Sequence, residues 1–303
     1  PGEIIGTISK EVAEITGIPE GLEIIASGSD KACETLGTGA LCPDTASVSF
    51  GTATTLQITT KKYVEPQKYM PAYNSLVRGY FSPEIQISRG FWMVTWFKKQ
   101  FGHAEEKIAE HIGVPTEQIL DKSLLEIPAG SNGLMLQPYW APGLKIPEAK
   151  GTIIGFNDCH TKAHVYKSIV EGIGYALYEG LEYLEKKSGQ KINKISVSGG
   201  GSQSDAICQI TADMFGRPVY RVQTYETSGL GAAMIAFWIK GEFANIDECN
   251  KAMVHFKDEF KPNLDNTKIY KHLFNKVYKG IYPQLQPLYL KLYEIVNEEN
   301  NEI

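Results

Sequence analysis

Long apolar runs and an excess of basic charge are both absent from this 303-residue sequence. No run reaches the roughly 18 apolar residues that a membrane-spanning helix requires, and no signal peptide opens the chain. The formal net charge is -5, from 30 basic and 35 acidic residues. Because nucleic-acid binding needs a basic surface, we expect neither a nucleic-acid nor a membrane partner.

Cysteine and histidine are too few and too scattered to predict a disulfide framework or a metal site. The five cysteines are odd in number and form no CxxC pair, which is typical of reduced thiols in a cytoplasm. His160 and His164 form an i, i+4 pair but lack the HExxH context of a zinc site. We expect surface or packing roles for both and assign no metal ligand.

An initiator methionine is absent as well, because the chain begins with Pro1 and Gly2. We interpret the chain as a piece of a longer polypeptide or as a processed product. Its length allows one large domain or two, with a sizeable buried core.

Strand and helix patterns alternate along most of the chain. Such alternation predicts a layered α/β domain with helices on both faces of a sheet. The stretch 104–150 is irregular and is expected to be an ordered surface loop or insert. Strands are predicted at residues 23–27, on both sides of the joint at 51–52, and at 72–78, 151–156, 194–198 and 218–222; helices are predicted at 31–40, 89–102, 161–189, 204–216, 228–241 and 267–297.

The most informative segment is "KISVSGGGSQSDAICQITADMFG", in which a strand meets three glycines and then a helix. Gly199, Gly200 and Gly201 let backbone N–H groups approach a ligand without a Cβ in the way. The helix that follows adds free N–H donors and positive partial charge. The joint favours nucleotide or anion binding over a plain tight turn, although it matches neither GxGxxG nor GxxxxGK[ST].

Two further glycine joints leave their roles open. In "SVSFGTATTLQ", Gly51 and Thr52 can form a simple hairpin turn, but their backbone and hydroxyl groups can also hold phosphate oxygens. The glycine and alanine run in "TSGLGAAMIAFW" is more typical of close helix packing than of ligand contact.

Asp30 is a lone carboxylate where the strand at 23–27 gives way to the helix at 31–40. It can cap that helix by accepting N–H bonds, which is worth roughly 1 kcal/mol. It can also act as a general base toward a hydroxyl, a role typically worth about 10²–10⁴-fold in rate. The residues alone favour the cap, and the two roles do not exclude each other.

Taken in order, these segments resemble the C-terminal domain of the FGGY family of carbohydrate kinases, from Pro1 to about Phe260. "GSDKACETLGTGA" resembles the segment that holds the family's catalytic base, and "SFGTATTL" resembles its phosphate-binding hairpin. "SRGFWMVTWF" is similar to a helix entered by a glycine near the nucleotide, "VSGGGSQSDAICQITADMFGRPV" to the adenosine-binding signature, and "ETSGLGAAMIAFWIKGEF" to the segment that follows it. The resemblance implies Asp30 as the catalytic base and ATP-binding roles for Gly51, Thr52, Gly90, Gly199, Gly200, Gly201, Ser202 and Ser204.

The resemblance further implies a ribonuclease H-like, actin-like ATPase fold, with a mixed sheet and helices on both faces. It implies phosphorylation of a sugar or polyol hydroxyl with ATP and Mg as cofactors, and a possible homodimer. Residues 1–25 would end the first, substrate-binding domain or form a linker, and residues 26–303 would form the ATP-binding domain, with 104–150 as a variable insert. The Asp-x-Gly-Thr/Ser phosphate loop of the family's first domain is absent, so we expect a missing N-terminal domain as partner and no activity from this chain alone.

The chain departs from the family at Gln203, Ser204 and Asp205, where glycerol kinase tends to have Ala and Asn pairs. We therefore expect the glycines, rather than these side chains, to carry most of the binding. The alternative function is a non-catalytic, actin-like nucleotide-binding sensor or assembly module. Asp30 at the expected position favours the kinase, because a pure binding module needs no base there.

Overall fold

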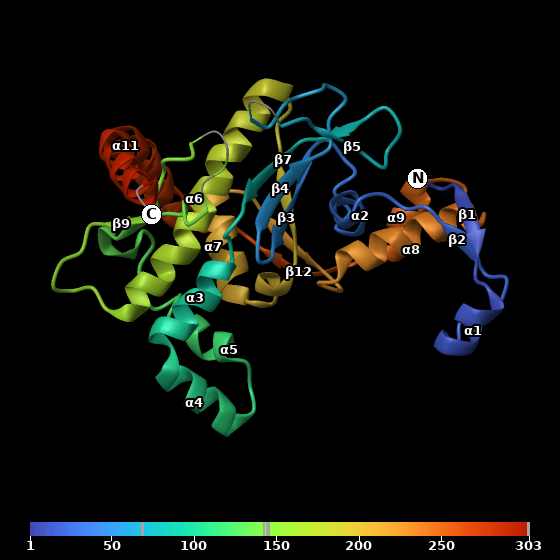
Figure 1. The fold of residues 1–303 in the computed structure, drawn as a ribbon, viewed down its shortest axis with the longest axis horizontal. Coiled ribbons are helices and arrows are strands. Elements are labelled where there is room, and N and C mark those ends of the chain that lie inside the picture. Colours follow the sequence, from blue (N-terminus) through green and yellow to red (C-terminus); the bar gives the residue numbers. More distant parts are fainter. Residues whose placement is uncertain (68–69, 142, 144–145, 302–303) are drawn as a thin grey trace.

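The computed structural model describes residues 1–67, 70–141, 143 and 146–301. Its centre is a six-stranded sheet in the order β12-β11-β10-β3-β4-β7 (Figure 1). β3, β10 and β11 are parallel, whereas β4, β7 and β12 run antiparallel to their neighbours, so the predicted mixed sheet is confirmed. The strand bounds are β3 (Thr45–Phe50), β4 (Thr54–Ile58), β7 (Glu84–Ile87), β10 (Lys194–Ser198), β11 (Val219–Val222) and β12 (Phe256–Phe260).

Helices cover both faces of this sheet, as the sequence predicts (Figure 1). One face packs against α3 (Trp92–Phe101), α6 (Lys162–Ser188) and α7 (Asp205–Phe215), and the larger hydrophobic core lies there. α6 comes close to the strands through Gly180, where a Cβ would stand 2.5 Å from Ile85 Cγ2. The other face packs against α2 (Asp30–Gly37), and α8 (Thr227–Ile239) packs on α2.

The sheet face under α2 is polar, because serine alternates with apolar residues along β3 and β10. Midway along the strands, Ser196 donates to the Thr38 carbonyl at 2.7 Å. Thr38 in turn donates to Ser47 at 3.0 Å. Near the strand ends, Ser198 donates to Glu34 at 2.8 Å. Buried hydroxyls need such partners, so these bonds orient α2 with its N-terminus toward the carboxyl ends of β3 and β10.

α2 and α8 lie in unusually close contact because each carries a glycine at the crossing point. A Cβ on Gly37 would stand 2.0 Å from the Thr227 carbonyl oxygen, and one on Gly231 would stand 1.9 Å from the Cys33 carbonyl oxygen. No side chain fits in either place. The expectation that the run "TSGLGAAMIAFW" marks close helix packing is therefore confirmed.

The remaining elements surround this centre. None of the residues of α1 is buried, and the unit of β1, α1 and β2 projects from the α8 side of the molecule (Figure 1). The stretch 104–150 contains short helices and a strand that pairs with β9. The bounds are β1 (Ile4–Thr7), α1 (Lys10–Thr16), β2 (Glu23–Ile25), α4 (His103–Ile112), α5 (Thr116–Asp121), β8 (Met135–Gln137), β9 (Thr152–Ile154), α9 (Ile246–Met253), α10 (Leu264–Leu273) and α11 (Lys279–Asn301).

Several predicted elements differ in the structure. The extended stretch at 72–78 contains only β5 (Tyr73–Asn74), which pairs with β6 (Phe81–Ser82) and not with the meander. The strand beside β4 is instead β7, a four-residue strand that was not predicted from the sequence. The tail helix is interrupted by a π-helical turn, Phe274–Tyr278. None of the described helices is both long and apolar enough to cross a membrane.

Candidate functional site

The loops that follow β3 and β10 meet at one edge of the sheet. Ser49 pairs with Ser198, so both strands end at the same level. The backbone of Gly199, with a φ of +78°, lies so close to the end of β3 that a Cβ would stand 3.0 Å from the Phe50 carbonyl carbon. Only glycine suits that conformation and that contact. The predicted phosphate turn and the predicted glycine joint are therefore neighbours in space.

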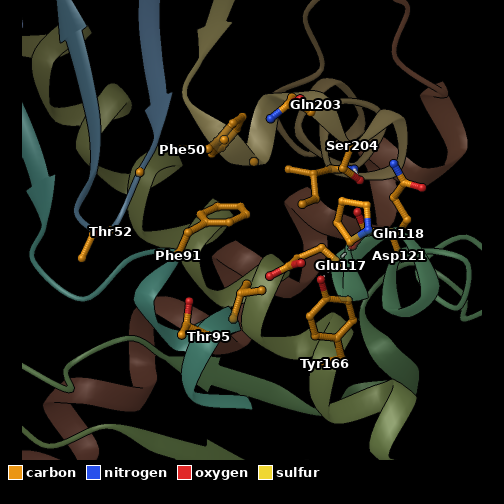
Figure 2. A pocket seen from close by; sticks show the side chains of 16 residues that line it. Phe50, Thr52, Phe91, Thr95, Glu117, Gln118, Asp121, Tyr166, Gln203 and Ser204 are labelled. Atoms are coloured by element: carbon orange, nitrogen blue, oxygen red, sulfur yellow. Dashed lines mark hydrogen bonds between the residues drawn. The ribbon is translucent and has the colours of Figure 1, made fainter. Parts of the chain in front are cut away.

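A cavity of about 510 Å³ opens beside these two loops (Figure 2). Its walls come from the turn after β3, from α3, α5 and α6, and from the start of α7. Five of the residues with a predicted ATP-binding role line it: Gly51, Thr52, Gly200, Gly201 and Ser204. Residues separated by about 150 positions in the sequence thus form one site, as their predicted roles require.

The other three predicted ATP-binding residues lie behind the cavity wall and contact protein. A Cβ on Gly90 would stand 2.0 Å from Thr54 Oγ1, so this glycine lets the start of α3 approach β4. Ser202 is fully buried and donates to the Gly199 carbonyl at 2.7 Å. Gly90, Gly199 and Ser202 therefore shape the loops, while the cavity surface is formed by their neighbours.

An aromatic pair forms the apolar part of the cavity. The rings of Phe50 and Phe91 have centroids 5.2 Å apart and are inclined to each other (Figure 2). Phe91 reaches the glycine joint because Gly201 has no side chain: a Cβ there would stand 2.6 Å from Phe91 Cε1. Aromatic surfaces of this kind suit a flat organic ring better than an anion.

One wall of the cavity was not predicted from the sequence, because it comes from the irregular stretch 104–150. α5 carries Glu117, Gln118 and Asp121 along the cavity, at the end remote from Thr52 (Figure 2). Only a short amphipathic pattern marks α5 in the sequence, and nothing local shows that it folds back toward α7. The stretch predicted as an insert is thus part of the site.

The two carboxylates of this wall differ electrostatically. Glu117 pairs with Lys98 at 2.7 Å; burial opposes ionisation, but this hydrogen bond and charge bring the pKa of Glu117 below its usual value. Asp121 Oδ1 accepts a hydrogen bond from the Tyr166 hydroxyl at 2.7 Å, and the Ser204 side chain is its second partner. Burial raises the pKa of Asp121 above its usual value, although both hydrogen bonds oppose that shift.

Asp30 lies at the same sheet edge, on the face opposite the cavity. The alternative role considered for it, the helix cap, belongs instead to Ser29, whose Oγ accepts the Ala32 N–H at 3.2 Å. The exposed Asp30 carboxylate accepts only the Lys31 N–H, at 2.8 Å, among its hydrogen bonds to described residues. The first N–H groups of a helix lack acceptors within the helix, and here Ser29 supplies one of them. The Asp30 carboxylate is therefore not needed as the cap and remains accessible to a ligand.

A buried polar network supports the first turns of α2 beneath Asp30. Lys31 donates to Glu34 at 2.6 Å, and Glu34 also accepts from Ser198, the last residue of β10. Nearby, Gln57 donates to Glu84 at 2.7 Å, and burial raises the pKa of Glu84 even though the Lys31 charge opposes the shift. The network ties the position of Asp30 to the strand that enters the glycine joint.

The chain resembles proteins of known class over nearly all of its length. It is 29% identical to an uncharacterized sugar kinase of Escherichia coli K12, covering 99% of this chain and 61% of that protein. It is also 29% identical to the xylulose kinase of Bacillus subtilis 168, covering 94% of this chain and 56% of the relative. The crystal structure of xylulose kinase from Rhodospirillum rubrum superposes with a TM-score of 0.80 at 25% identity, covering 95% of this chain and 57% of that one.

The chain therefore spans little more than half the length of these relatives. Their shared architecture confirms the actin-like ATPase fold expected from the sequence. Residues 46–239, nearly two thirds of the chain, match the C-terminal domain of one family. This chain belongs to the FGGY family of carbohydrate kinases.

Proposed function

We propose that this chain supplies the nucleotide site and the general base of an ATP-dependent sugar or polyol kinase. The observation that carries the proposal is that the cavity and the exposed carboxylate of Asp30 lie at one edge of the sheet, on its opposite faces. A nucleoside in the cavity would direct its phosphates over that edge, between Gly51 and Gly200. The phosphate chain would then end on the side of Asp30.

The cavity residues fit a nucleoside with a polyphosphate tail. Phe50 and Phe91 offer apolar surface for the base and ribose. At the sheet edge, the backbone of Gly51 and Gly200 and the hydroxyl of Thr52 offer hydrogen-bond donors to phosphate oxygens. A Cβ at Gly200 would meet no protein atom within 4 Å, so the space beside this backbone is open to a ligand.

In the proposed reaction, Asp30 accepts the proton of a substrate hydroxyl as that oxygen attacks the γ-phosphorus of ATP. The new oxygen–phosphorus bond forms as the bond to the β-phosphate oxygen breaks, and ADP leaves. Positioning and charge stabilisation supply most of the rate in such transfers. The exposed position of Asp30 at the start of α2 suits this role, because substrate reaches it without displacing protein.

Magnesium would accompany the nucleotide rather than occupy a protein cage. Within the described ranges, no group of three or more His, Cys, Asp or Glu side chains is arranged to hold a metal ion. Mg²⁺ commonly keeps several waters and binds through substrate phosphates and one or two carboxylates, so this donor set fits a nucleotide-borne ion near Asp30. The ion would neutralise phosphate charge during transfer.

The sugar would be held largely by a part of the protein that these residues do not include. The relatives are longer, and none of the residues of α1 is buried, so we propose that residues 1–25 belong to, or lead from, a first substrate-binding domain. Residues 26–303 would form the second, nucleotide-binding domain. A homodimer and reduced cysteines in a cytoplasm stay predictions.

A substrate screen tests the proposal. A polypeptide of the relatives' full length that includes this chain would be incubated with ATP and a panel of ketoses, polyols and aldonates, beginning with xylulose. We expect ADP release that depends on one sugar class, with a phosphorylated sugar as product. ATP binding with no acceptor phosphorylated across the panel would contradict the kinase and favour a nucleotide-binding sensor.

A further inference from the structure

The end of the cavity remote from Thr52 carries groups able to recognise a base. Gln118, Asp121 and Ser204 lie together there (Figure 2). Carboxylates repel a polyphosphate, whereas backbone donors at Gly51 and the Thr52 hydroxyl attract one. A nucleotide bound with its phosphates at Thr52 therefore points its base toward α5.

The environment of Asp121 holds its carboxylate as an acceptor. Tyr166 donates its hydroxyl hydrogen to Oδ1 at 2.7 Å. The Ser204 oxygen accepts the Ile207 N–H at 3.3 Å as the N-cap of α7, so its hydroxyl hydrogen is available to Asp121. An ionised carboxylate has about four lone-pair positions, so these two donors leave about two for a ligand.

Neighbouring side chains do not offer the same selectivity. The Glu117 carboxylate is neutralised by Lys98 at 2.7 Å, whereas none of the ion pairs formed by the described residues includes Asp121. The Gln118 amide presents both a donor and an acceptor, so it can pair with either kind of base. Among the described residues of this wall, Asp121 is therefore the acceptor-only group that forms no ion pair.

We propose that Asp121 selects the base of the nucleotide by accepting a hydrogen bond from the exocyclic amino group of adenine. A 6-oxo purine presents an oxygen at that position, which a carboxylate repels. Guanine could instead offer its N1 and N2 donors, one to each carboxylate oxygen, but Oδ1 already accepts from Tyr166, whereas a single amino group needs only one free position. This inference rests on the proposed function and adds the base preference.

The test compares nucleotides that differ in the base. Isothermal titration of the 303-residue chain with ADP, inosine diphosphate and GDP gives the affinity ratios. We expect ADP to bind at least roughly tenfold more tightly than either 6-oxo nucleotide, since a hydrogen bond to a charged group contributes about that much. GDP binding as tightly as ADP would overturn the inference.

Two substitutions at the same position separate base recognition from stability. Asp121→Asn keeps the shape and adds a donor, so the preference for ADP should fall roughly tenfold, with inosine diphosphate binding improved or unchanged. Asp121→Ala removes the acceptor without adding a donor and should weaken ADP more than inosine diphosphate. Equal losses for both nucleotides would assign Asp121 to the ribose or to the fold and overturn the inference.

A matched control completes the design. Asp158→Asn makes the same chemical change on an exposed residue outside the cavity and should leave all three affinities unchanged. If the unaltered chain bound none of the three nucleotides, the proposed nucleotide site itself would be contradicted. If the Asp121 variants still bound ADP with an unchanged ratio of ADP to inosine diphosphate affinity, only the proposed base preference would be contradicted.

Discussion

A larger side chain at Gly200 would fill part of the cavity without disturbing the fold. A Cβ built on this residue would meet no heavy atom within 4 Å, and its φ lies outside the left-handed range that only glycine tolerates well. Gly200 lines the cavity, so the side chain of Gly200→Val would project into it. The adjacent Gly201 offers no such clean test, because a Cβ there would stand 2.6 Å from Phe91 Cε1.

The expected magnitude follows from steric crowding of the bound nucleotide. Forcing extra methyl groups into an already filled space costs about 1–3 kcal/mol. Converted to affinity, this is a loss of roughly 5–150-fold in ADP binding. The unfolding free energy should change by less than about 0.5 kcal/mol, since the new side chain meets no protein atom in the free protein.

Titration calorimetry with ADP and urea denaturation measure the two quantities separately. Gly6→Val is the matched control: a Cβ at Gly6 also meets nothing within 4 Å, but this residue lies in β1, away from the cavity. We expect unchanged ADP affinity in the control. Unchanged affinity in Gly200→Val, with an intact fold, would refute the placement of the phosphates beside the glycine joint.

Two further predictions concern the carboxyl groups of Glu171 and Asp121. Glu171 is the buried acceptor for Lys167 and for three hydrogen-bond donors from other segments. Glu171→Ala leaves all four without that acceptor and should lower the unfolding free energy by about 3–5 kcal/mol in a denaturant titration. A loss below about 1 kcal/mol would show that these interactions are dispensable for stability. Burial raises the pKa of Asp121, so this carboxyl takes up a proton at a higher pH than an ordinary aspartate. A protonated carboxyl is no longer acceptor-only, so the ratio of ADP to inosine diphosphate affinity should fall as the pH is lowered from about 7 toward about 5. A ratio that stays constant over this range would contradict the prediction.

The regular elements could be predicted because their signals are local. β10, the glycine joint and α7 appear in the sequence as an apolar run, three glycines and an amphipathic helix, and the structure places them there. β12, "FKDEF", was missed because it is an edge strand with charged residues, which lack the apolar alternation that marks a strand.

The composition of the cavity could be predicted only in part. Gly51 and Gly200 carry a signal that needs no partner, because a glycine at a strand end indicates close backbone approach. Asp121 carries none, since it lines the site only when α5 folds against α6 and α7, a long-range contact that periodicity does not encode. The cap was assigned to Asp30 rather than Ser29 because adjacent residues of either type suit a helix start, and only backbone geometry separates them.

The proposed role of Asp30 is tested most directly by Asp30→Asn in a polypeptide of the relatives' full length, assayed with its preferred sugar. Ser29 caps α2, so the substitution should leave the fold intact. We predict that kcat falls on the order of 10²-fold or more, while the ADP dissociation constant stays within about twofold, because the base acts on the sugar hydroxyl and not on the nucleotide. Turnover near that of the unaltered enzyme would contradict the assignment of Asp30 as the general base.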